Sequence, residues 1–155
     1  MPAVSADLRA LLNGTDLFIF PEDYVVVYLS QTKTISGEWF RKATTRFAVV
    51  IQEPKTVTMI IPRRKWLRMQ NIFDKYEANG PWKVISFKMK ASYVPVGYLA
   101  VMESVLKEAR IDAIPVSTMR NTHVLVPKAD LPRAVRHLRD FLASSKEEKK
   151  VKKRS

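Results

Sequence analysis

The residues best suited to chemistry in this sequence are cations, and their densest group is the stretch Arg63-Arg64-Lys65-Trp66-Leu67-Arg68. Arginine and lysine side chains bind phosphate oxygens, and an interleaved tryptophan can stack on a nucleobase. The stretch also begins a predicted helix, where cations oppose the helix macrodipole. Four cations at that position indicate an external polyanion. The alternative interpretation is a solvated helix start, and we expect Trp66 itself to lie in the core.

Two further groups of cations follow near the C-terminus. Three arginines recur along one predicted helix, and residues 146–155 hold six basic and two acidic residues. Cations on a helix are more often a solvated face, and basic tails either bind nucleic acid or only increase solubility. We expect the tail to be a flexible basic arm under either interpretation. The cations assigned to nucleic-acid binding in this part of the chain are Arg133, Arg136, Arg139, Lys149, Lys150, Lys152, Lys153 and Arg154.

The net charge supports the same hypothesis. The 155 residues include 27 lysines and arginines against 15 aspartates and glutamates, so the formal net charge is +12. The tail contributes +4 of this, which leaves +8 on the rest of the chain. A field of that sign favours polyanions, either nucleic acid or an anionic membrane surface.

Composition argues against several kinds of catalytic and metal site. The chain has no cysteine, which excludes disulfides, Cys-ligated zinc, iron–sulfur clusters and a thiol nucleophile. His123 and His137 are its only histidines, so a His-rich metal centre is not expected. There is no glycine-rich phosphate loop and no Ser/His/Asp order. We therefore expect no enzyme activity, no metal and no cofactor. The acidic residues considered for catalysis are scattered along the chain, at Glu38, Glu53, Glu77, Glu103 and Asp112.

The sequence also bears on where the protein works. No apolar run approaches the roughly 18 residues that cross a bilayer, and residues 1–10 lack the apolar region of a signal peptide. We expect a cytoplasmic protein without a membrane partner. The chain has four glycines, three glutamines and abundant Lys, Arg and Glu, a composition typical of thermophile proteins.

Apolar periodicity predicts the elements that must position these residues. Trp66, Met69, Phe73 and Tyr76 recur at helical spacing and predict one helix over 63–77. Asn79-Gly80-Pro81 is then a strong predicted stop, and Pro115 indicates an edge strand or a bulge. In the last helix, which Asp130 is expected to cap, the predicted inward positions are Leu131, Val135, Leu138 and Leu142. Helices are also predicted over 5–12 and from 97 to 109, and strands over 24–29, 47–51, 56–61, 83–90, 111–116 and 122–126.

These elements form a weak internal repeat. Residues 60–63 (IIPR) open one helix and residues 125–128 (LVPK) open another, each after an adjacent strand pair and a longer strand. Two copies of a β-(α)-β-β-α unit place helices on one face of antiparallel sheets, an α+β fold. The opening helix of the first copy is missing or irregular, because residues 31–45 are polar. The predicted segments are an N-terminal helix over 1–14, units over 15–80 and 81–145, and a basic tail over 146–155.

The second copy resembles an ACT domain. The resemblance rests on residues 96–100 (VGYLA), 106–111 (LKEARI), 116–118 (VST) and 124–126 (VLV), followed by Leu131 and Ala134. The first copy is similar more loosely, over 24–29, Trp39, 47–52 and 56–60. The chain is most similar to the tandem ACT family, which includes eukaryotic arginine sensors and many small prokaryotic proteins. The resemblance covers roughly residues 15–142 and implies tandem ferredoxin-like (βαββαβ) units.

The resemblance also implies an amino-acid ligand, held by the loop before the first helix of an ACT unit and by residues after its second strand. A helix N-terminus suits the carboxylate of such a ligand. Family members often carry acidic residues after the Ser-Thr pair, but residues 119–123 (MRNTH) here contain none. The positions implied for the ligand are Val94, Pro95, Val96, Gly97, Ser117, Thr118 and Thr122.

Two functional hypotheses follow. The charge and the tail favour a non-enzymatic protein that binds RNA or a ribonucleoprotein such as the ribosome on an ACT-like scaffold. The resemblance favours the alternative, a regulatory ACT protein that binds an amino acid. The sequence analysis favours the first hypothesis narrowly.

Overall fold

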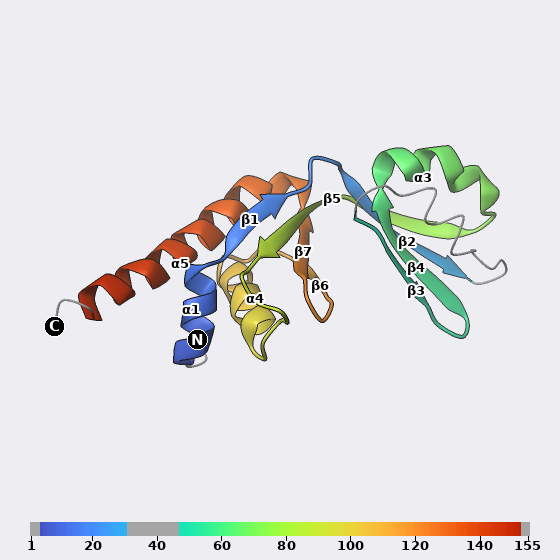
Figure 1. The fold of residues 1–155 in the computed structure, drawn as a ribbon. Coiled ribbons are helices and arrows are strands. Elements are labelled where there is room, and N and C mark those ends of the chain that lie inside the picture. Colours follow the sequence, from blue (N-terminus) through green and yellow to red (C-terminus); the bar gives the residue numbers. More distant parts are fainter. Residues whose placement is uncertain (1–3, 31–46, 153–155) are drawn as a thin grey trace. The chain divides into compact units, whose positions relative to one another are not determined.

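The computed structural model describes residues 4–30 and 47–152, with side chains described as far as residue 146. The chain forms two compact units. One unit, here called the inserted unit, runs from Phe20 to Lys83. The other, here called the split unit, combines the residues up to Ile19 with those from Val84 onward. Figure 1 shows the elements of both.

The inserted unit is an antiparallel sheet with a helix on one face. Its strand order is β3-β4-β2-β5, in which β2 pairs with both β4 and β5. Alternation along β2 buries Val25, Val27 and Leu29, and these pack with Trp66 and Met69 of the helix. The elements are β2 (Tyr24–Ser30), β3 (Val49–Gln52), β4 (Thr56–Pro62), α3 (Arg63–Met69), η1 (Gln70–Ile72) and the first part of β5 (Tyr76–Lys88).

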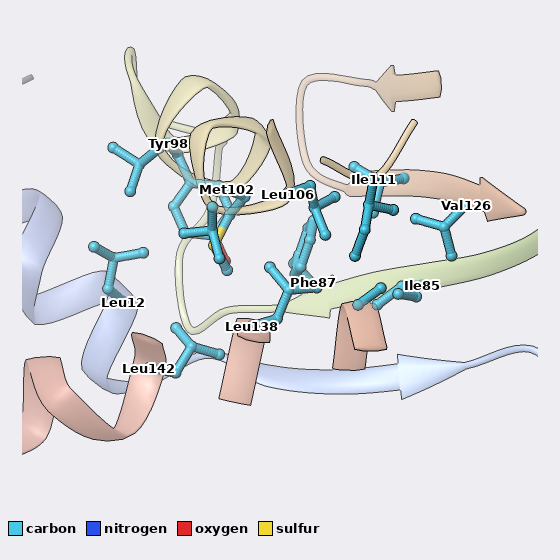
Figure 2. Packing of buried hydrophobic residues seen from close by; sticks show 14 of the residues in the cluster. Leu12, Ile85, Phe87, Tyr98, Met102, Leu106, Ile111, Val126, Leu138 and Leu142 are labelled. Atoms are coloured by element: carbon cyan, nitrogen blue, oxygen red, sulfur yellow. The ribbon is translucent and has the colours of Figure 1, made fainter. Parts of the chain in front are cut away.

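The split unit has the strand order β1-β5-β7-β6, and α1, α4 and α5 supply its helical layer. Figure 2 shows Leu12 of α1, Met102 of α4, Leu138 of α5 and Phe87 of β5 in one buried cluster. The elements are α1 (Ala6–Asn13), β1 (Asp16–Ile19), the end of β5, α4 (Tyr98–Glu108), β6 (Ile114–Ser117), β7 (Thr122–Pro127), η2 (Lys128–Asp130) and α5 (Leu131–Lys152).

The two strand orders are the same arrangement. In the inserted unit, β4 of the β3-β4 hairpin lies beside β2, and β2 lies beside a fourth strand. In the split unit, β7 of the β6-β7 hairpin lies beside β5, and β5 lies beside a fourth strand. In the inserted unit the fourth strand is the start of β5; in the split unit it is β1, from near the N-terminus. The predicted α+β fold of repeated ferredoxin-like units is confirmed.

The predicted segment boundaries differ from the units of the structure. We expected residues 1–14 to be a separate helix, but Leu8 and Leu12 of α1 lie in the core of the split unit. The Thr15 hydroxyl also lies 2.8 Å from the buried Tyr98 hydroxyl of α4. The segment predicted over 81–145 therefore takes its fourth strand and an extra helix from residues before the inserted unit.

Two predicted elements of the inserted unit are wrong. The helix expected over 63–77 ends at Met69, a short 3-10 turn follows, and Tyr76 already belongs to β5. The stop expected at 79–81 is the interior of that strand. Gly80 makes this possible: its φ is +156°, and a Cβ at this position would lie 2.9 Å from the Tyr24 carbonyl oxygen. Only glycine tolerates that approach without a shift of the backbone.

Other predictions at the ends of elements are confirmed or corrected by small amounts. The side chain of Ser5 caps α1 by accepting a hydrogen bond from the Leu8 amide at 3.2 Å. Pro115 lies in β6 at the edge of its sheet. The predicted arm over 146–155 is helical as far as Lys152, where α5 ends. Residues 153–155, and the polar stretch 31–45 with Trp39, lie outside the described residues.

Candidate functional site

The cation cluster at the start of α3 lies on the surface of the inserted unit. Arg63, Arg64 and Arg68 are exposed, and Lys65 is half-buried. Within the described part of the chain, none of these four side chains forms an ion pair. Trp66 is 3% exposed, so its predicted core position is confirmed, and it cannot stack on a base. Its ring instead stacks on Phe73 at 5.8 Å and meets Tyr76 edge-on at 4.7 Å.

The predicted cations of α5 belong to the other unit, and one of them has a structural role. Arg136 and Arg139 are exposed. Arg133 donates from Nη2 to the Ala109 carbonyl at 2.7 Å and from Nη1 to Asp130 at 3.2 Å, which fastens α5 to the end of α4. Lys149, Lys150 and Lys152 lie in the backbone of α5 beyond the described side chains, and Lys153 and Arg154 lie outside the described residues. The α3 group belongs to the inserted unit, and the α5 group belongs to the split unit.

The positions that the resemblance implied for a ligand do come together in the split unit. The Val94 amide donates to the Met119 carbonyl at 2.8 Å, which joins the loop before α4 to the turn between β6 and β7. Gly97 begins α4 in the left-handed region, with φ +85°. The remaining implied residues, Pro95, Val96, Ser117, Thr118 and Thr122, flank this junction.

The polar side chains of this junction are occupied with the turn itself. The Thr118 hydroxyl accepts from the amides of Arg120 and Asn121, at 3.3 and 3.1 Å. The Ser117 and Thr122 hydroxyls lie 3.3 Å apart, and Thr122 is fully buried. Residues 88–97 and 117–123 contain no acidic residue. The junction therefore has no carboxylate of its own to pair with a ligand's ammonium group.

The sequence analysis missed a hollow beside α4. The hollow has a volume of about 610 Å³, and it lies between α4 and the segment that leads into β6. Two of the acidic residues that looked scattered in the sequence border it together, because Glu103 lies on α4 and Asp112 follows the end of that helix. The signal was a Glu–Lys pair four residues apart, followed closely by Arg110 and Asp112. The lining residues are Ala100, Glu103, Ser104, Lys107, Arg110, Ile111, Asp112 and Ala113.

Two other titratable groups of the split unit have shifted pKa values. Burial and the nearby Lys88 lower the pKa of His123 from its usual 6.5, which favours the neutral ring. Burial raises the pKa of Tyr98 to about 12, and its hydrogen bond with Thr15 offsets only part of that rise. In the residues that the structure describes, no group of three or more His, Asp and Glu side chains could hold a metal ion. Nor does any helix in that part combine the length and apolar character needed to cross a membrane.

Comparisons with known proteins place the fold. No protein-family model matches the chain, and no curated protein matches its sequence. Among solved structures, a Vibrio cholerae protein of unknown function, described as a possible transport protein, is similar at a TM-score of 0.69 and 18% identity. The similarity covers 88% of this chain and 96% of that one.

Parts of aspartate kinases have the same fold. The regulatory subunit of the Thermus flavus enzyme is similar at a TM-score of 0.53 and 10% identity, over 84% of this chain and 97% of that one. The Clostridium acetobutylicum aspartate kinase, described as an important allosteric enzyme, is similar at a TM-score of 0.61 and 13% identity. This similarity covers 83% of this chain and 34% of that one. These similarities confirm the expected ACT-like α+β fold.

Proposed function

We propose that this chain is a regulatory module that binds a small ligand, which was the alternative hypothesis from the sequence. The observation that carries this proposal is the extent of the structural similarity. The regulatory subunit of an aspartate kinase aligns over 97% of its length with 84% of this chain. Both units of the chain also have the strand order of an ACT-like unit. The finer assignment, to the tandem ACT family that includes arginine sensors, is part of this proposal.

The geometry also gives less support to the RNA hypothesis than the sequence did. Trp66 is buried and therefore unavailable for stacking, and Arg133 is engaged with the end of α4. The proposed role is regulatory, and we propose no catalytic residue for the chain.

A ligand screen tests this function. A ligand that binds only the folded state at 100 times its dissociation constant adds about 2.7 kcal/mol to the free energy of unfolding, which is an easily measured rise in Tm. We expect at least one compound from a panel of amino acids, nucleotides and organic acids to raise the Tm saturably. A panel without any stabilising compound would refute the proposal.

RNA binding remains a second candidate function because of one observation. Four cations lie close together within two turns of α3, and within the described residues none of them forms an ion pair: Arg63, Arg64, Lys65 and Arg68. Each phosphate contact adds roughly 0.7–0.9 to the slope of log affinity against log salt. Changing Arg63, Arg64 and Arg68 together to glutamine should lower the slope for a structured RNA by about 2 to 3 if all three bind phosphate.

The exposed arginines of α5 provide the control for that experiment. Arg136→Gln with Arg139→Gln removes charge from the surface of the split unit and should change the slope less. Equal slopes for the wild type and the triple α3 variant would show that α3 does not bind RNA.

A further inference from the structure

The hollow beside α4 is a concave site with charged walls. Its volume of about 610 Å³ lies within the range of about 300–1,000 Å³ that is usual for small-molecule sites. One wall is a single face of α4, formed by residues at positions 100, 103, 104 and 107. The other wall is the segment 110–113, so the whole site belongs to the split unit.

Hydrogen bonds fix the end of the helix where the two walls meet. The Arg110 amide donates to the Lys107 carbonyl and the Ile111 amide to the Leu106 carbonyl, each at 3.0 Å. This pair of bonds is a Schellman motif, and Ile111 packs into the core at 5% exposure. From α5, Arg133 binds the Ala109 carbonyl at 2.7 Å. The backbone around the hollow is therefore held in place without a ligand.

Arg110 occupies a backbone position that normally belongs to glycine. Its φ is +55°, and it is the one described non-glycine residue with a positive φ. Helices that end in this motif usually have glycine there, because a Cβ is disfavoured in the left-handed region. An arginine at this position places a long cationic side chain at the rim of the hollow.

The charges around the hollow are balanced but not paired with each other. Glu103 and Asp112 are acidic, and Lys107 and Arg110 are basic. Within the described part of the chain, none of these four side chains forms an ion pair or a side-chain hydrogen bond. Lys107 and Arg110 are three residues apart at the C-terminal end of α4, and Glu103 lies about one turn earlier on the helix.

We propose that this hollow binds a small zwitterion, with its carboxylate at Lys107 and Arg110 and its cationic group at Glu103 and Asp112. This inference rests on the proposed regulatory function and names the ligand class and the site. Two charges of each sign complement such a ligand, and the small side chains of Ala100 and Ala113 leave room for the rest of it. The junction of residues 94–97 with 117–122 lacks the acid that the cationic group requires.

The test uses the twenty protein amino acids as probes, each with its N-acetyl and amide derivatives. The first derivative lacks the ammonium and the second lacks the carboxylate, so each removes one half of the proposed recognition. We expect at least one amino acid to raise the Tm saturably, and both of its derivatives to bind at least tenfold more weakly. Derivatives that bind as tightly as the parent would overturn the zwitterion assignment.

Matched variants locate the site. Glu103→Gln and Lys107→Gln should each weaken binding roughly 10- to 100-fold, because each removes a charged hydrogen-bond partner. Glu108→Gln, on the same helix but outside the hollow, and Lys90→Gln, in the loop before α4, should leave the affinity unchanged. Circular dichroism checks that all four variants remain folded.

The outcomes separate this inference from the proposed function. If an amino acid binds but the two hollow variants keep full affinity, the ligand site lies elsewhere and the inference is wrong, while the regulatory function stands. The inference is also wrong, and the regulatory function again stands, if only compounds that are not zwitterions bind. If nothing in either panel binds, both the inference and the proposed function fail.

Discussion

Lys83 should be essential to the stability of the inserted unit, although it is a charged residue in a strand. Only 8% of it is exposed. Its Nζ donates to the carbonyls of Pro21 and Glu22 at 2.7 and 3.1 Å and to the Asp23 carboxylate at 3.3 Å. The single ammonium therefore ties the segment that enters β2 to the strand that completes the unit.

Lys83→Met keeps most of the length of the side chain and removes all three donors. Removal of one partner of a buried ion pair costs about 3–5 kcal/mol, because the other charge is left without compensation. Here the Asp23 side chain is 28% exposed, so water recovers part of that loss. We therefore expect the free energy of unfolding to fall by about 2–4 kcal/mol. The exposed Lys75 provides the control, and Lys75→Met should change stability by less than about 0.5 kcal/mol.

The distribution of tryptophans makes the measurement specific. Trp39, Trp66 and Trp82 are the only tryptophans, and all three fall within the sequence range of the inserted unit. Urea unfolding followed by tryptophan fluorescence therefore reports on that unit, while far-ultraviolet circular dichroism reports on both. A loss below about 1 kcal/mol, or one equal to that of Lys75→Met, would refute the proposed role of the ammonium.

Three further predictions concern the split unit. Leu138→Ala should cost about 2–5 kcal/mol in urea unfolding, because the side chain is fully buried; a smaller loss would contradict its place in the core. Tyr98→Phe should cost about 0.5–1.5 kcal/mol, because it removes the hydrogen bond of 2.8 Å between the Tyr98 and Thr15 hydroxyls. Thr15 keeps its own bond to the Leu11 carbonyl at 2.8 Å, so Thr15→Val in the same background should cost about 1 kcal/mol more. Burial and Lys88 lower the folded-state pKa of His123 below its usual 6.5, so the unfolded chain takes up the proton more readily. The free energy of unfolding should therefore be fully retained above pH 6.5 and fall as the pH drops towards the folded-state pKa, and His123→Gln should flatten that dependence.

Elements and buried positions that depend on interactions between residues close in the sequence were mostly predicted correctly. The run of β-branched and aromatic residues over 24–29 predicted β2, and the helical stripe predicted the burial of Leu138 and Leu142. The aromatic stripe at Trp66, Phe73 and Tyr76 is instructive, because its contacts are real although the expected helix is not. The chain leaves the helix after Met69, and the strand then brings Tyr76 back to the same indole ring.

Features that depend on pairing between distant segments were not predictable from local signals. Asn79-Gly80-Pro81 has the chemistry of a turn, but pairing with β2 keeps the segment extended. The register shifts between Tyr24 and Val26, opposite this stretch, and Gly80 fits there because it has no Cβ. The residues that we expected to end an element therefore lie in the interior of a 13-residue strand.

The candidate site shows the same limit in functional terms. Glu103 and Asp112 are nine residues apart, and no glycine marks the turn after α4 that brings them to one hollow. The spacing of the charges was therefore a weak signal, because it did not show where the chain turns. The Schellman motif at Arg110 and the bond from Arg133 to the Ala109 carbonyl create that proximity, and the second of these depends on a helix that begins 22 residues later. An arginine that we assigned to phosphate binding thus supports the wall of the hollow that we propose as a ligand site. In a basic protein, charge alone does not distinguish cations that bind a partner from cations that position the backbone. The hydrogen bonds of each side chain make that distinction.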